Sequence, residues 1–92
     1  MSRPEALRLI RSAAGDSARV FFTAHAEARL LQRKITRRQV IECLLNGAIT
    51  EGPAPSLKGG WECAVERIVL GDRVKVAVVI DDDGDLVIKS AM

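Results

Sequence analysis

Apolar residues in the first part of the chain recur at the spacing of short amphipathic helices. Ser2 can cap a first helix, which we expect to end near Gly15. The β-forming residues 19–22 then predict a short strand. Thr23 can cap a second helix over residues 24–34, so the pattern places one strand between two helices.

The third helix has the clearest local signal in the chain. Thr36 and Gln39 have the spacing of a capping box. An apolar stripe follows them, made of Val40, Ile41, Leu44 and Leu45. Asn46-Gly47 is typical of a left-handed helix end, so we expect the helix to stop there.

The second half of the chain alternates between apolar and polar positions, which is the pattern of half-buried strands. Strands are expected over residues 61–70, 74–80 and 85–90, and residues 48–51 can begin another. Two prolines and three glycines in residues 52–60 predict a loop. Asp83-Gly84 predicts a hairpin turn before the last strand.

These elements give a leading helix followed by the order β-α-α-β-β-β. Because consecutive strands joined by short turns pair as hairpins, we predict an α+β fold with helices on one face of an antiparallel sheet. Residues 1–92 are expected to form one domain. Within it, residues 1–17 would be an accessory helix and residues 19–92 the core.

Composition narrows the functions open to such a domain. Phe21, Phe22 and Trp61 are its only aromatic residues, too few for the row of rings on which single-strand binding proteins stack bases. Residues 1–38 hold nine Lys and Arg against three Asp and Glu, whereas residues 39–92 hold five against nine. A basic helical layer can attract phosphate or an acidic partner, although a merely solvated helix surface explains it equally well.

The sequence gives no pattern for a metal or another cofactor. Cys43 and Cys63 lie among apolar neighbours, without CxxC or HxxxH spacing, and are expected to be free buried thiols. Neither a secretory leader nor an apolar run long enough to cross a bilayer is visible. We therefore expect a cytoplasmic protein that does not act at a membrane.

Two groups of helical side chains are candidates for chemistry. His25 and Arg29 are four residues apart and share a helix face, where an acid or base and a phosphate clamp would be neighbours. A local hydrogen bond for His25 and an anchoring role for Arg29 are the favoured alternative. Four cations flank the start of the third helix and could hold an anion at its N-terminus: Arg33, Lys34, Arg37 and Arg38.

The predicted strands add further cations, among them Arg67 and Lys89. Basic groups on a sheet face can hold a scissile phosphate, but most strand cations simply point to solvent. The run Asp81-Asp-Asp-Gly84-Asp85 lacks the spacing and terminal glutamate of a calcium loop, so we interpret it as a charged hairpin turn.

Four ordered pieces of the sequence resemble a small bacterial family of domains of unknown function. These pieces are FTAHAEARLLQRK with its HAxxR motif, ITRRQVIECLLNGAITE, KGGWECAV and the closing LVIKSAM. They span most of the chain, from about residue 21 to residue 92.

This family is similar in element order to the RelE, BrnT and MqsR toxins of bacterial toxin–antitoxin pairs. The resemblance implies a RelE-like fold and a metal-independent endoribonuclease that acts on messenger RNA, often at the ribosome. It also implies a cognate antitoxin as a partner. The catalytic candidates are then His25, Arg29, Arg67 and Lys89, and RNA would be bound by Arg33, Lys34, Arg37 and Arg38.

Two other interpretations remain open. The chain has a single histidine, no tyrosine and a divided charge. These features also suit a non-catalytic module that docks an acidic protein or nucleic acid through its basic helical layer. A structural protein whose sheet edge pairs with a second copy is the third possibility.

Overall fold

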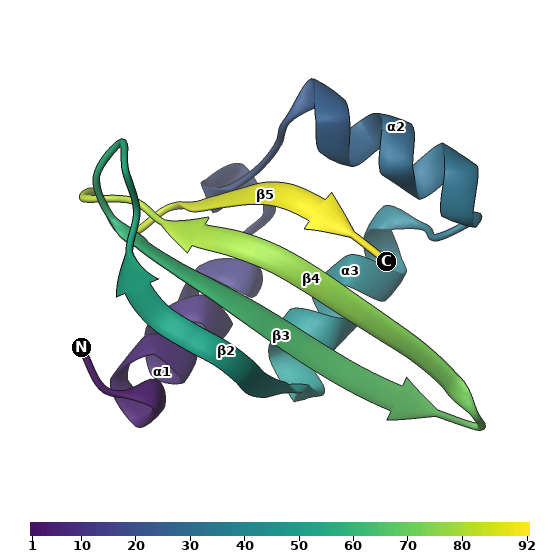
Figure 1. Cartoon of the computed structure of the whole chain (residues 1–92), viewed down its shortest axis with the longest axis horizontal. Coiled ribbons are helices and arrows are strands. Elements are labelled where there is room, and N and C mark those ends of the chain that lie inside the picture. Colours follow the sequence, from purple (N-terminus) through teal and green to yellow (C-terminus); the bar gives the residue numbers. More distant parts are fainter.

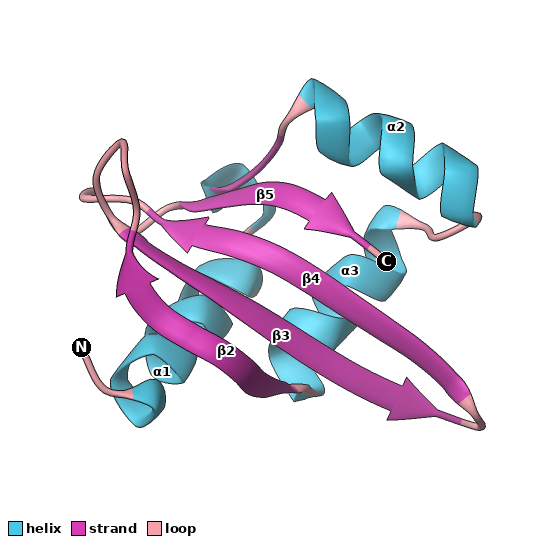
Figure 2. Cartoon of the chain, viewed as in Figure 1, coloured by secondary structure: helices cyan, strands magenta, loops and turns pink.

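The computed structural model has the α+β fold that the sequence predicts (Figure 2). The structure describes residues 1–92, except for the side chain of Val69. The elements are α1 (Arg3–Ala14), the 3-10 turn η1 (Ser17–Arg19), β1 (Val20–Phe22), α2 (Ala24–Arg33), α3 (Arg37–Asn46), β2 (Ala48–Pro55), β3 (Trp61–Val69), β4 (Asp72–Ile80) and β5 (Leu86–Ala91).

The five strands form one mixed sheet in the order β1-β5-β4-β3-β2. The hairpin pairs β2–β3, β3–β4 and β4–β5 are antiparallel, as predicted, but β1 runs parallel to β5. No hairpin joins β1 to β5, since the helices and three strands separate them in sequence. The prediction of a wholly antiparallel sheet is therefore wrong for this pair, because it assumed strands joined by short turns.

Helices α1 and α3 cover one face of the sheet, while α2 packs beside β5 (Figure 1). We call the helix-covered side the inner face and the other side the outer face. Fully buried side chains join the two layers: Ile10, Val40, Leu44, Val65, Val76, Val78, Leu86 and Ile88. Helix α1 also adds Ala6, Ala13 and Ala14 to this core.

The predicted loop over residues 52–60 is wrong in its first part, because strand β2 continues to Pro55. β2 thus adds one strand to the expected order. β2 lies at the edge of the sheet and pairs only with β3. An edge strand tolerates Pro53 and Pro55, which have no N–H group to donate to a neighbouring strand. Register shifts on both sides of Glu51 absorb the irregular backbone, and Gly52 adopts a positive φ of 81°.

Helix α3 ends at Gly47, but the predicted left-handed end is wrong. Gly47 is extended, with φ −82° and ψ −175°. It is buried, and a Cβ atom there would lie 2.6 Å from the carbonyl oxygens of both Cys43 and Glu66. Close packing of α3 on β3, rather than backbone conformation, therefore requires glycine at this position.

The predicted helix N-caps agree with the structure. Ser2 and Thr23 cap α1 and α2, and Thr36 forms the full capping box with Gln39.

The longest helix has 12 residues, and in the described part of the chain no helix combines the length and apolarity needed to cross a bilayer.

Candidate functional site

A basic groove lies between the start of α3 and the hairpin that joins β3 to β4. Figure 1 shows this hairpin running past α3 to the edge of the molecule. The groove consists of two adjoining cavities of about 220 and 280 Å³, which share Gln39, Asp72 and Val74. Its charged lining residues are Arg33, Lys34, Glu42, Arg67, Asp72 and Arg73.

The turn between α2 and α3 brings two of these cations to the groove. Lys34 adopts a left-handed conformation, with φ 55° and ψ 41°, and its N–H closes the last turn of α2 on Leu30 and Leu31. The capping box at Thr36 starts α3 two residues later. Arg33 and Lys34 are thereby held at the mouth of the groove, as an exposed pair facing the β4 residues Asp72 and Arg73.

Arg67 enters the groove from the inner face of the sheet. It pairs across the ladder with Val74, which packs against the core, so its side chain lies on the same side. Its guanidinium NH1 is 3.6 Å from Glu42 Oε2, while Arg38 Nε donates to Glu42 Oε1 at 3.2 Å. The side chains of Arg67 and Glu42 are 32% and 44% exposed, so an ion from solvent can reach both.

Cys43 lines the same groove but is poorly suited to act as a nucleophile. Its Sγ lies 3.4 Å from the carbonyl oxygen of Val65 and 3.5 Å from that of Val74. Burial raises the pKa of the Cys43 thiol to about 11, although the nearby Arg67 charge lowers it in part. A thiol that stays protonated at neutral pH is a poor nucleophile. As predicted, Cys43 and Cys63 are both free and buried.

The structure separates the four cations that the sequence places at the start of α3. Arg33 and Lys34 line the groove. Arg38 borders it through Glu42. Arg37 points elsewhere: it pairs with Glu27, and its guanidinium lies 4.8 Å from the ring centroid of Phe22. That contact ties α3 to β1, so Arg37 is engaged within the fold.

The four predicted catalytic residues do not come together. Lys89 follows the buried Ile88 and lies on the outer face, where its Nζ is 3.4 Å from Glu62 Oε1. The sheet therefore separates Lys89 from Arg67. His25 is exposed in the first turn of α2, about 13 Å along the helix axis from Lys34. Arg29 is half-buried one turn after His25.

Sequence reasoning missed the acidic side of the groove, which Glu42 and Asp72 supply. A local signal was available for Glu42, because Arg38 and Glu42 have the four-residue spacing of a helical ion pair. Asp72 and Arg73 lie just after the hairpin turn. Their place opposite Lys34 depends on how the hairpin folds over α3, and no spacing in the sequence encodes that.

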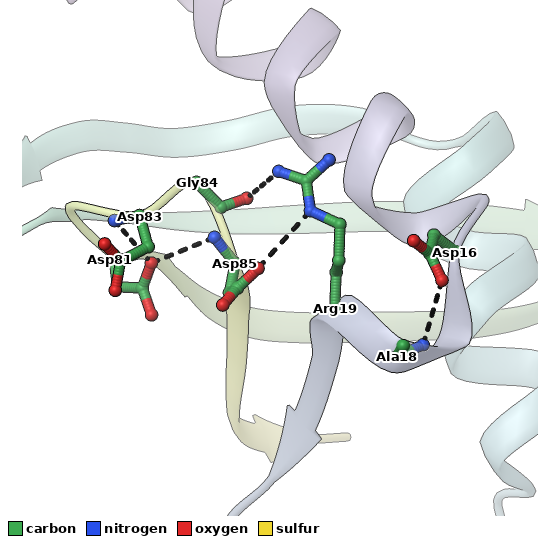
Figure 3. A network of polar contacts seen from close by, with 7 residues as sticks. All are labelled: Asp16, Ala18, Arg19, Asp81, Asp83, Gly84 and Asp85. Atoms are coloured by element: carbon green, nitrogen blue, oxygen red, sulfur yellow. Dashed lines mark hydrogen bonds and ion pairs between the residues drawn. The ribbon is translucent and has the colours of Figure 1, made fainter.

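The acidic run after β4 is a hairpin turn, as predicted (Figure 3). Asp81 Oδ1 accepts hydrogen bonds from the backbone N–H groups of Asp83 and Asp85. Arg19 closes the network, with Nε 3.3 Å from Asp85 Oδ1 and NH2 donating to the Gly84 carbonyl at 2.7 Å. These groups join η1, just before β1, to the β4–β5 turn.

Comparison with known proteins places the chain in a family. No curated protein and no solved structure matches it. A family model described as a domain of unknown function, DUF4258, matches residues 22–92. The matched part includes α2, α3, β2, β3, β4 and β5, and therefore the whole basic groove, whereas α1 precedes it. The chain thus belongs to the DUF4258 family of domains of unknown function.

Proposed function

We propose that this protein binds the phosphate backbone of RNA in the basic groove, as a RelE-like protein of the toxin–antitoxin type. One observation carries the proposal: the α2–α3 turn and the inner face of the sheet bring Arg33, Lys34 and Arg67 to one open groove. Phosphate contacts supply most of the affinity of proteins that bind nucleic acids without reading their sequence. Arginine is suited to this role because its planar guanidinium can bind two phosphate oxygens at once.

An acidic protein partner would also suit these cations. Phosphate is favoured because Arg67 is confined at the junction of α3 and β3, beside Glu42 and the buried Cys43. A cavity of about 220 Å³ is large enough for a phosphate group with its sugar, but too small to admit the surface of a folded protein partner. In a toxin–antitoxin pair, an acidic antitoxin segment would compete for the same groove.

Cleavage of the bound RNA is a second candidate function, favoured by the contact between Glu42 and Arg67. A carboxylate can take the proton of a ribose 2′-hydroxyl, and a guanidinium can stabilise the charge that develops on the phosphate. The 2′-oxygen would form a bond to the adjacent phosphorus, and the bond to the 5′-oxygen would break. The products are a 2′,3′-cyclic phosphate and a 5′-hydroxyl, which takes its proton from water.

Binding is best tested with a labelled single-stranded RNA over a series of salt concentrations. The groove variant is Arg33→Gln/Arg67→Gln, and the matched control is Arg8→Gln/Lys75→Gln. Each double variant removes two positive charges. Each also combines an exposed helical arginine with a strand cation that forms an ion pair, Arg67 with Glu42 and Lys75 with Glu51.

We expect the groove variant to bind RNA more weakly and with a shallower salt dependence. Loss of two phosphate contacts should reduce the slope of log affinity against log salt by about 1.4. The control should keep the wild-type slope. Equal weakening of both variants would show that only net charge attracts RNA, and the proposed groove would then be wrong.

A further inference from the structure

A second cavity, on the outer face of the sheet, is separate from the basic groove. Its volume is about 430 Å³, and it lies between the β2–β3 loop and the outer sides of β4 and β5. We call it the outer-face cavity. Figure 1 shows the β2–β3 loop rising at the end of the sheet where β4 turns into β5. The volume is within the range of pockets that hold small organic ligands.

The floor of the outer-face cavity is apolar and its rim is charged. Val79 and Val87 come from neighbouring strands and pair directly across the ladder, which gives a flat floor. Lys58 from the loop and Lys89 from β5 bring two ammonium groups. Glu62 lies beside them, with its Oε1 3.4 Å from Lys89 Nζ.

Two large apolar side chains are exposed next to this floor. Phe21 is the direct neighbour of Val87 across the β1–β5 pair, and 52% of its surface is exposed. Val20 and Phe22 pack against the core, so Phe21 points to the outer face. Leu57, at the opposite rim, is fully exposed. Exposed apolar groups gathered around one cavity commonly mark a ligand site.

We propose that the outer-face cavity binds a nucleoside monophosphate, either free or as the 5′-phosphorylated end of an RNA strand. Each part of such a ligand has a counterpart. Lys58 and Lys89 neutralise the phosphate. The Glu62 carboxylate accepts hydrogen bonds from ribose hydroxyls. The valine floor and the Phe21 ring receive the face of the base, since stacking on an aromatic ring is available to every base.

This site is independent of the proposed function, because the sheet lies between the outer-face cavity and the basic groove. The experiment is equilibrium dialysis of the full chain against AMP, adenosine and ribose 5-phosphate. We expect AMP to bind at least about tenfold more tightly than either fragment, because only AMP engages both the lysines and the apolar floor.

Two variants locate the binding. Lys89→Met and Phe21→Ser should each weaken AMP binding, the former by about tenfold, the usual cost of losing a charged hydrogen bond. Lys75→Met is the matched control, since Lys75 is also an outer-face lysine paired with a glutamate, at 2.6 Å, but lies outside the cavity. The control should keep wild-type affinity. Circular dichroism checks that every variant is folded.

The outcomes are distinct. Unchanged AMP affinity in folded Lys89→Met and Phe21→Ser proteins, or equal affinity for AMP and ribose 5-phosphate, would overturn the proposal. A 5′-phosphorylated RNA pentamer then distinguishes the two sources of the ligand. Weaker pentamer binding in Lys89→Met identifies an RNA end as ligand. If the pentamer responds only to Arg33→Gln/Arg67→Gln while AMP responds to Lys89→Met, the site takes the free nucleotide.

Discussion

The Glu42 carboxylate lies 3.6 Å from the Arg67 guanidinium, in the place where an RNA phosphate would have to bind Arg67. Arg38 holds the other carboxylate oxygen at 3.2 Å. Arg38 and Arg67 therefore share a single carboxylate of the protein. A phosphate must either displace Glu42 or share these cations with it.

Glu42→Gln is expected to bind RNA more tightly than the wild type, because an amide competes poorly for the two guanidinium groups. Exposed ion pairs contribute about 0.2–1 kcal/mol, so the gain in affinity should be about two- to fivefold. Fluorescence anisotropy with a labelled RNA measures it. Glu27→Gln is the matched control, since Glu27 pairs with Arg37 away from the groove.

The same variant separates binding from cleavage. If Glu42 is the general base, Glu42→Gln loses cleavage of a defined RNA although it binds that RNA at least as well. Retained cleavage by folded Glu42→Gln would remove Glu42 from the mechanism. Weaker RNA binding by this variant would instead show that Glu42 positions Arg67 rather than competing with the phosphate.

Growth on induced expression tests the toxin-type proposal in cells. We expect the wild type to slow bacterial growth and Arg67→Ala to relieve this, because Arg67 is the cation most confined within the groove. Arg8→Ala removes an exposed charge from α1 and should remain as toxic as the wild type. Full toxicity of Arg67→Ala, at equal levels of folded protein, would exclude Arg67 from the toxic activity.

Local signals predicted the fold better than they predicted the site. The capping box of Thr36 and Gln39 and the cap at Thr23 depend on residues close in sequence, and both form as expected. The extended β2 and the parallel β1–β5 pair depend on the position of each strand within the sheet. Nothing in the local pattern of apolar residues specifies that position.

The site illustrates the same limit. Arg67 and Lys89 are both strand cations, but one lies on each face of the sheet, and sequence reasoning placed them in one catalytic set. The alternation along β5 already places Lys89 and the apolar Ile88 on opposite faces of the sheet. The sequence could not tell which face of the sheet the helices cover, and therefore that Lys34 and Arg67 would line one groove beside Asp72.

Gly47→Ala should destabilise the protein through a steric clash alone. The backbone of Gly47 has a φ of −82°, which alanine adopts freely, but the added Cβ would lie 2.6 Å from two carbonyl oxygens. Overpacking of this kind costs about 1–3 kcal/mol. Urea unfolding measures the change in the free energy of unfolding.

Gly15→Ala is the control for this clash. Gly15 also ends a helix with a negative φ, −73°, but its nearest atoms would be 3.6 Å from an added Cβ. Its stability should stay within about 0.5 kcal/mol of the wild type. A similar loss in both variants would mean that glycine flexibility at helix ends, rather than the contact of α3 with β3, explains the effect.

The Cys43 thiol should make stability fall at alkaline pH. Burial raises its pKa from the ordinary value of 9.0 to about 11 in the folded protein. The unfolded chain therefore loses this proton first as the pH rises. The stabilisation is complete below pH 9, and it is lost between pH 9 and 11, by about 2 kcal/mol at pH 10.5.

Urea unfolding of the wild type and Cys43→Ala at pH 7.5 and 10.5, under reducing conditions, isolates this contribution. All other ionisable groups are the same in both proteins, so their effects cancel in the comparison. The wild type should be the more stable protein at pH 7.5, because alanine leaves a small cavity between α3 and the sheet. Its advantage should shrink by about 2 kcal/mol at pH 10.5.

A constant difference between the two proteins would show that the thiol ionises in the folded state as readily as in the unfolded chain. Arg67 would then stabilise the thiolate enough to offset its burial, and Cys43 would become a candidate nucleophile in the groove.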